Sequence, residues 1–74
     1  MTVKEAVAIL TKKYPGRVVL GYWEDGDDYI FNTKPIKAIR GLAAPGQFVV
    51  TKDGDVYGTN PMRHNLDPKA MKKI

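Results

Sequence analysis

The chain has 74 residues, with 12 Lys or Arg, 8 Asp or Glu, no Cys and a net charge of +4. A chain of this length holds one domain and buries only about 60% of its extended surface, so a large active-site cleft is not expected. The absence of Cys excludes disulfides, thiol catalysis and thiolate metal sites. No apolar run approaches bilayer length and residues 1–5 lack the pattern of a signal peptide. We therefore expect one folded, cytoplasmic domain over residues 1–74, without a membrane partner.

The first segment has the pattern of an amphipathic helix. Thr2 and Glu5 are spaced as in a capping box, in which each side chain accepts a hydrogen bond from the backbone N–H of the other residue. Apolar residues then recur at helical spacing at Val3, Ala6, Val7, Leu10 and Tyr14. Because Pro15 and Gly16 cannot continue a helix, we predict a helix over residues 3–14.

Two hairpins are predicted next, each with an Asp-Gly dipeptide that supplies the positive φ of a tight turn. Residues 17–23 alternate between two sets of side chains, and residues 28–33 are rich in aromatic and β-branched types, which predicts the first pair of strands. Residues 47–52 and 55–58 predict the second pair.

The other segments are less regular. Residues 35–40 are compatible with one helical turn. Asp67 followed by Pro68 is an N-cap pattern, so a short terminal helix through Lys72 is predicted.

These elements predict an α+β fold, in which the N-terminal helix packs on one face of a three- to four-stranded antiparallel meander and a short helix ends the chain. The expected core consists of Val7, Leu10, Val18, Leu20, Phe31 or Ile30, Phe48, Val50 and Val56. Trp23, Val49 and Tyr57 are expected on the opposite face, where only the terminal helix shields them. A partner or a second copy would bind at such a face.

Few residues suited to catalysis are present. The sequence has no Ser, and its single His, His64, lies in a proline-bounded segment without an identifiable partner. The acidic cluster of residues 24–28 does not follow the EF-hand pattern. We interpret it as a solvated hairpin turn, or as an acidic tip for a basic partner, in preference to a calcium site. No catalytic residue, metal site or cofactor is predicted.

Three binding hypotheses follow. The first is a non-enzymatic protein-interaction module that binds an unidentified protein through its exposed sheet face and edge, with the aromatic anchors Tyr22, Trp23, Tyr29 and Tyr57. The alternative is a sequence-nonspecific nucleic-acid binder with a basic face formed by Lys34, Lys37, Arg40, Lys69, Lys72 and Lys73. The third is a homodimer that forms through an unpaired strand edge.

Three segments carry a resemblance to known proteins. Residues 3–16, 29–32 and 48–56 resemble the small helix-then-meander proteins found in Firmicute prophages. More loosely, they are similar to the YrhB-like bacterial immunity proteins, whose last strands also combine an aromatic, aliphatic residues and a Lys-Asp-Gly type of turn. The resemblance covers residues 3–58 and implies a binding or neutralising role without catalytic residues.

Overall fold

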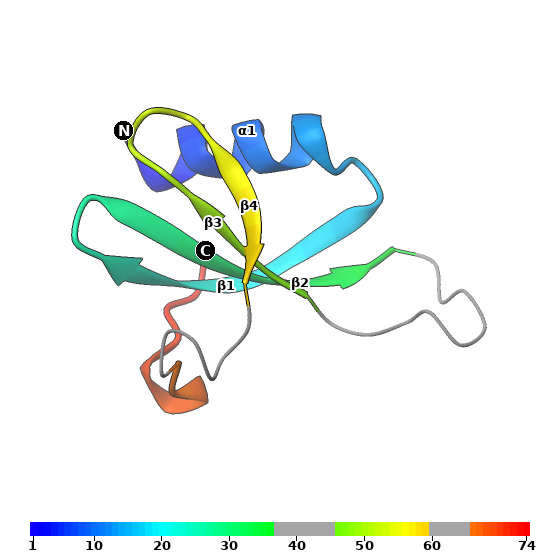
Figure 1. The fold of residues 1–74 in the computed structure, drawn as a ribbon. Helices are drawn as coiled ribbons and strands as arrows, with labels where there is room; N and C mark the ends of the chain where they lie inside the picture. The colour runs from blue at the N-terminus through cyan, green and yellow to red at the C-terminus, as the bar shows by residue number, and fades with distance from the viewer. Residues whose placement is uncertain (37–45, 60–65) are drawn as a thin grey trace.

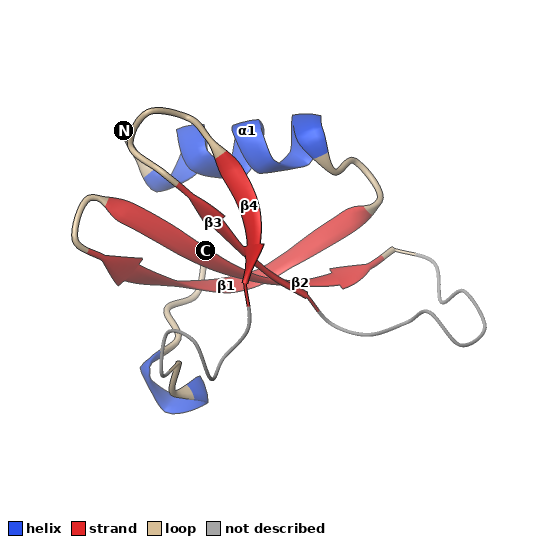
Figure 2. Ribbon diagram, in the orientation of Figure 1, coloured by secondary structure: helices blue, strands red, loops and turns tan. Residues whose placement is uncertain are grey.

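The computed structural model describes residues 1–36, 46–59 and 66–74. The elements in these residues are a helix, four strands and a short 3-10 helix (Figures 1 and 2). In chain order they are α1 (Val3–Lys13), β1 (Arg17–Asp25), β2 (Asp28–Pro35), β3 (Gly46–Val50), β4 (Val56–Thr59) and η1 (Pro68–Ala70). The strands form one antiparallel sheet in the order β1-β2-β3-β4. The predicted α+β fold is therefore confirmed.

The capping box and the proline set the ends of helix α1. Thr2 Oγ1 accepts a hydrogen bond from Glu5 N at 3.2 Å, and Thr2 N donates to Glu5 Oε1 at 3.3 Å. At the other end, Tyr14 N donates to Leu10 O at 2.8 Å before Pro15 interrupts the backbone pattern. The helix lies across one face of the sheet (Figure 2), which we call the helix face.

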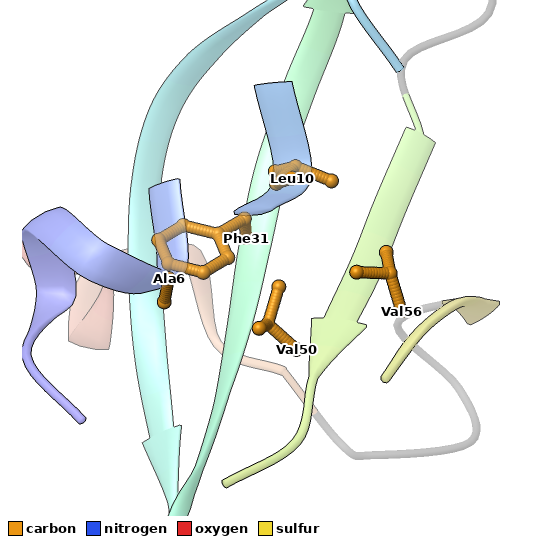
Figure 3. Packing of buried hydrophobic residues seen from close by; sticks show 5 residues of the cluster. All are labelled: Ala6, Leu10, Phe31, Val50 and Val56. Atoms are coloured by element: carbon orange, nitrogen blue, oxygen red, sulfur yellow. The ribbon is translucent and has the colours of Figure 1, made fainter. Parts of the chain in front are cut away.

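The hydrophobic core lies between α1 and the helix face. Its buried members come from the helix and from three of the strands (Figure 3), and they are Ala6, Leu10, Phe31, Val50 and Val56. Tyr14 and Phe48 close one side of this core with their ring centroids 4.7 Å apart. Leu10, Phe31, Val50 and Val56 are thus buried as predicted, while Val7 and Phe48 are partly buried at the margin.

A β-bulge in β1 contradicts part of the predicted core. The pairing of β1 with β2 shifts between Val19 and Gly21, which leaves Leu20 as an extra residue. The core prediction assumed a strict two-residue alternation, and the bulge breaks that alternation. Val18 and Leu20 are consequently 40% exposed each, so their predicted burial was wrong, and Val19 packs against the core in their place.

The face opposite α1 is the one along which residues 66–74 return (Figure 1), and we call it the tail face. The register places Trp23, Ile30, Val49 and Tyr57 in one row across its four strands. Phe31 and Ile30 are both buried because they point to opposite faces of β2. The sequence had left open which of these two residues is in the core.

The end of the chain departs from the predicted terminal helix. Asp67 caps η1 as expected, because its side chain accepts a hydrogen bond from Lys69 N at 2.9 Å. The helix nevertheless ends at Ala70, since Met71 is extended and Lys72 pairs with β1. The helical turn predicted over residues 35–40 lies mostly outside the described residues, and Pro35 itself ends β2. None of the helices in the described ranges is long and apolar enough to cross a membrane.

Candidate protein-interaction site

The centre of the tail face is buried, whereas its β4 end is exposed. Ile30 and Val49 are each 2% exposed, so a partner cannot reach the middle of this face. At the β1 end of the row, Trp23 is half-buried and its Nε1 donates to Asp67 O at 2.9 Å. At the β4 end, Tyr57 is 43% exposed. Within this row, the exposed face expected from the sequence is therefore reduced to its β4 end.

The four aromatic residues predicted as anchors are divided between the two faces. Tyr22 and Tyr29 lie on the helix face, where their ring centroids are 5.9 Å apart in an edge-to-face arrangement. Each ring centroid is also 6.1 Å from that of Phe31, so both rings extend the core. Trp23 and Tyr57 share the tail face. The structure therefore does not bring the four side chains together on one surface.

The outer edge of β1 is paired at Tyr22 with the chain's own tail, residues 66–74, and we call it the clasped edge. Tyr22 N donates to Lys72 O at 2.9 Å, and Lys72 N donates to Tyr22 O at 2.8 Å. The Lys72 ammonium lies 3.1 Å from Glu24 Oε2, and this hydrogen bond raises the pKa of Lys72 above its ordinary value. The tail thus adds one bridge and one ion pair to an edge that would otherwise offer open backbone groups.

Gly21 is required where the tail crosses β1. A Cβ at this position would lie 2.6 Å from Met71 Cγ and 2.8 Å from the carbonyl oxygen of Lys72. Met71 is also held from the neighbouring strand, because Asn32 Nδ2 donates to its sulfur at 3.6 Å. A glycine inside a strand pattern commonly marks a bulge or a close backbone approach, and Gly21 serves both purposes.

The outer edge of β4 differs in composition and in pairing, and we call it the free edge. Among the described residues, no strand pairs with this side of β4. Its residues, Val56–Thr59, include no charged side chain and no proline. Lysine, other charges and proline are the usual protections against edge-to-edge pairing, so the strand itself lacks them.

The direction of the backbone groups on β4 follows from the ladder. In an antiparallel pair, each residue points its N–H and C=O either toward or away from its neighbour, in strict alternation. Thr51 N donates to Asp55 O at 2.8 Å, so the groups of Tyr57 point inward to β3. The N–H and C=O groups of Val56 and Gly58 therefore point outward. The backbone groups of Tyr22 point outward to Lys72. Following the alternation from Tyr22 through the paired residues of β2 and β3 to β4 again gives an outward direction for Gly58.

One side chain already uses an outward group of the free edge. Lys13 Nζ, at the end of α1, donates to Val56 O at 3.4 Å. This distance is near the upper limit for a hydrogen bond, and Lys13 is exposed. Lys13 therefore protects the edge weakly, from a neighbouring element.

The acidic cluster of residues 24–28 is engaged within the chain. Glu24 pairs with Lys72 at 3.1 Å, and Asp28 Oδ1 accepts a hydrogen bond from Lys52 N at 3.1 Å. An open hollow of about 410 Å³ lies beside the cluster and includes Tyr29 and Lys52 in its lining. Across the described ranges, no group of three or more His, Cys, Asp or Glu is placed to hold a metal ion. His64 lies outside those ranges.

A second, smaller pocket lies where the tail meets the tail face. It has a volume of about 120 Å³ and is lined by Trp23, Asn32, Gln47, Leu66, Pro68 and Met71. Gln47 Nε2 donates to Asn32 Oδ1 at 2.9 Å, so the two polar side chains in the lining of this pocket bind each other. Its polar groups are thus largely satisfied by one another and by Met71.

The basic residues of the nucleic-acid hypothesis are placed only in part. Lys34, Lys69 and Lys73 are exposed, and Lys72 is bound to Glu24. Lys37 and Arg40 lie outside the described residues. The presence of Glu24 beside Lys72 would oppose a phosphate at that position, since like charges repel. Nucleic-acid binding stays a prediction.

Comparison with known proteins gives no relative on which to base a function: no family model, no curated protein and no solved structure matches the chain. The resemblance to prophage-encoded and YrhB-like proteins therefore stays a prediction.

Sequence reasoning missed the backbone groups of Val56 and Gly58, because edge position depends on strand order. The glycine inside β1 was the one local signal for the tail contact.

Proposed function

We propose that this protein is a non-enzymatic protein-interaction module that binds a protein partner along the free edge of β4 and over the exposed ring of Tyr57. The observation that carries the proposal is the free edge itself, where uncharged residues present outward N–H and C=O groups. An extended segment of another chain can add to such an edge as a new strand, and its main chain then supplies most of the affinity.

Tyr57 supports the same surface. Tyr57 is 43% exposed on the tail face directly beside the edge, so an added strand would contact its side chain. Tyrosine is enriched among residues that dominate binding energy, because it buries a large rigid area at low entropic cost. The free edge thus combines a directional backbone pattern with one aromatic anchor.

Two substitutions at one position test the proposal. Gly58→Pro removes the outward N–H of this residue and leaves the inward ladder to β3 intact, because proline is tolerated where a strand edge faces solvent. Gly58→Ala keeps that N–H, and its Cβ would lie 4.0 Å from Phe48, an ordinary contact. The two variants therefore differ mainly in the edge donor.

The experiment compares the proteins retained from a cell lysate by immobilised wild type, Gly58→Ala and Gly58→Pro. We expect the first two to retain the same protein and Gly58→Pro to lose it, while circular dichroism shows that all three are folded. Retention of a protein that is equal in all three variants would contradict a role of the free edge in binding.

A further inference from the structure

We infer that the partner on the free edge is a second copy of this chain, with the two β4 strands antiparallel about a two-fold axis at Tyr57, so that two sheets join into one. The inference rests on the proposed function and names its partner. It depends on three properties of Val56–Thr59: the faces of its side chains, the direction of its backbone groups, and its charge.

The faces of the side chains allow only some registers. Residues that oppose each other directly in an antiparallel pair lie on the same face of the sheet. Val56 and Gly58 lie on the helix face, since they oppose Val50 and Phe48, whereas Tyr57 lies on the tail face. A two-fold axis between two residues would oppose side chains of different faces, so the axis has to pass through a residue.

The backbone groups select Tyr57 as that residue. With the axis at Tyr57, Val56 of each copy opposes Gly58 of the other, and these are the residues whose groups point outward. Each Val56–Gly58 pair exchanges an N–H···O=C bond in both directions, and the axis generates two such pairs. The outward donors and acceptors of both residues are then satisfied.

The side chains suit this register. Tyr57 opposes Tyr57 of the second copy at a non-hydrogen-bonded position, where side chains are closest, and aromatic cross-strand pairs are favourable there. Gly58 offers no side chain to obstruct Val56 of the second copy. No charge opposes a like charge within the strand, although the chain as a whole carries +4.

The next residues outward introduce no conflict. The same register places Thr59 opposite Asp55 of the second copy, on the tail face. The charge of Asp55 is therefore opposed by an uncharged residue at each end of the strand pair.

Lys13 competes with the second copy for the carbonyl oxygen of Val56, and this competition gives a further test. In the dimer, Val56 O accepts from Gly58 N of the second copy in place of Lys13 Nζ, whose bond is 3.4 Å long. Removal of the Lys13 ammonium should therefore strengthen self-association. Lys12→Ala removes the same charge from the neighbouring residue of α1 and serves as the control for Lys13→Ala.

The test is sedimentation equilibrium of the purified chain over a wide concentration range. We expect wild type and Gly58→Ala to show a monomer–dimer equilibrium. The dissociation constant of the Gly58→Pro dimer should be at least about tenfold higher, because the variant loses one donor in each copy. Lys13→Ala should dimerise more tightly than Lys12→Ala. A wild type that stays monomeric, or a Gly58→Pro variant that dimerises like Gly58→Ala, overturns the inference.

The two proposals fail in different ways. A wild type that is monomeric but retains a different protein through an edge sensitive to Gly58→Pro contradicts the dimer and leaves the interaction module standing. A dimer that is lost in Gly58→Pro supports both. A chain whose self-association and protein retention are both indifferent to Gly58→Pro contradicts both.

Discussion

The two edges of the sheet differ in whether their outward backbone groups are paired within the chain. β1 is nine residues long, contains a bulge, and is paired at Tyr22 with Lys72 of the tail. β4 has four residues, is uncharged, and meets no strand on its outer side within the described ranges. An unpaired edge is a template for another chain, and proteins commonly block it by covering, bending or charging it. Within the described ranges, the fold pairs one edge at Tyr22 and leaves the other without a strand partner, and the proposed interaction rests on this difference.

The length of each edge sets how strongly it could bind. A long exposed strand would offer many backbone groups and a risk of uncontrolled association, so a self-supplied cover at β1 is advantageous. Four residues offer only the groups of Val56 and Gly58. Pairing through so few hydrogen bonds is weak for each contact, which suits a reversible interaction.

The largest expected effect on stability comes from a substitution at Gly21, where the tail crosses the clasped edge. Gly21→Ala would place a Cβ 2.8 Å from the Lys72 carbonyl, a backbone atom that cannot rotate away. The tail has to shift, and we expect unfolding in urea to show a loss of about 1–3 kcal/mol, the usual cost of overpacking. Gly16→Ala is the matched control, because a Cβ there meets nothing within 4 Å. Equal stability of the two variants would show that the tail does not pack against β1 as described.

A second comparison removes one polar group at each end of the tail-face row. Trp23→Phe deletes the Nε1 donor to Asp67 O, a bond of 2.9 Å, together with part of the ring, and should destabilise the fold by about 1 kcal/mol or more. Tyr57→Phe removes a hydroxyl from a residue that is 43% exposed and should leave thermal unfolding of the monomer nearly unchanged. A larger loss for Tyr57→Phe than for Trp23→Phe would contradict the contact between Trp23 and Asp67.

The two edges also show how far the sequence could be interpreted. Residues with local signals were predicted well: the capping box of Thr2 and Glu5 starts α1, and both Asp-Gly turns join adjacent strands. Each turn glycine has a positive φ, +60° at Gly26 and +90° at Gly54. The bulge at Leu20 was missed because it depends on pairing with β2, which no local pattern specifies. The burial of Val18 was mispredicted for the same reason.

The candidate site was predicted less well than the fold. Tyr57 was placed correctly on the face opposite the helix, because its strand alternates regularly after a clear turn. Tyr22 and Tyr29 were named as binding residues together with Tyr57, and they lie on the helix face, where their rings extend the core. The tail contact joins Tyr22 to Lys72, which are far apart in sequence, and neither residue type signals such a pairing.

The smallest expected effect is electrostatic and tests the clasped edge by pH. Because the Glu24 carboxylate raises the pKa of Lys72, the folded chain holds the Lys72 proton more tightly than the unfolded chain does. The stabilisation is complete below the ordinary lysine pKa and is lost as the pH rises through the raised pKa. Lys72→Met should therefore be less stable than wild type at neutral pH, with a difference that declines at alkaline pH. The difference is small because both side chains of the pair are about half exposed.

Urea unfolding of wild type, Lys72→Met and Lys69→Met over this pH range measures the effect. Lys69→Met removes a lysine of the same tail that has no ion pair among the described residues, so it is the control for the loss of one lysine side chain. A Lys72→Met difference that does not change with pH would mean that the ion pair does not hold the tail. The two backbone hydrogen bonds between Tyr22 and Lys72 would then be the contacts that close the β1 edge, and these do not titrate.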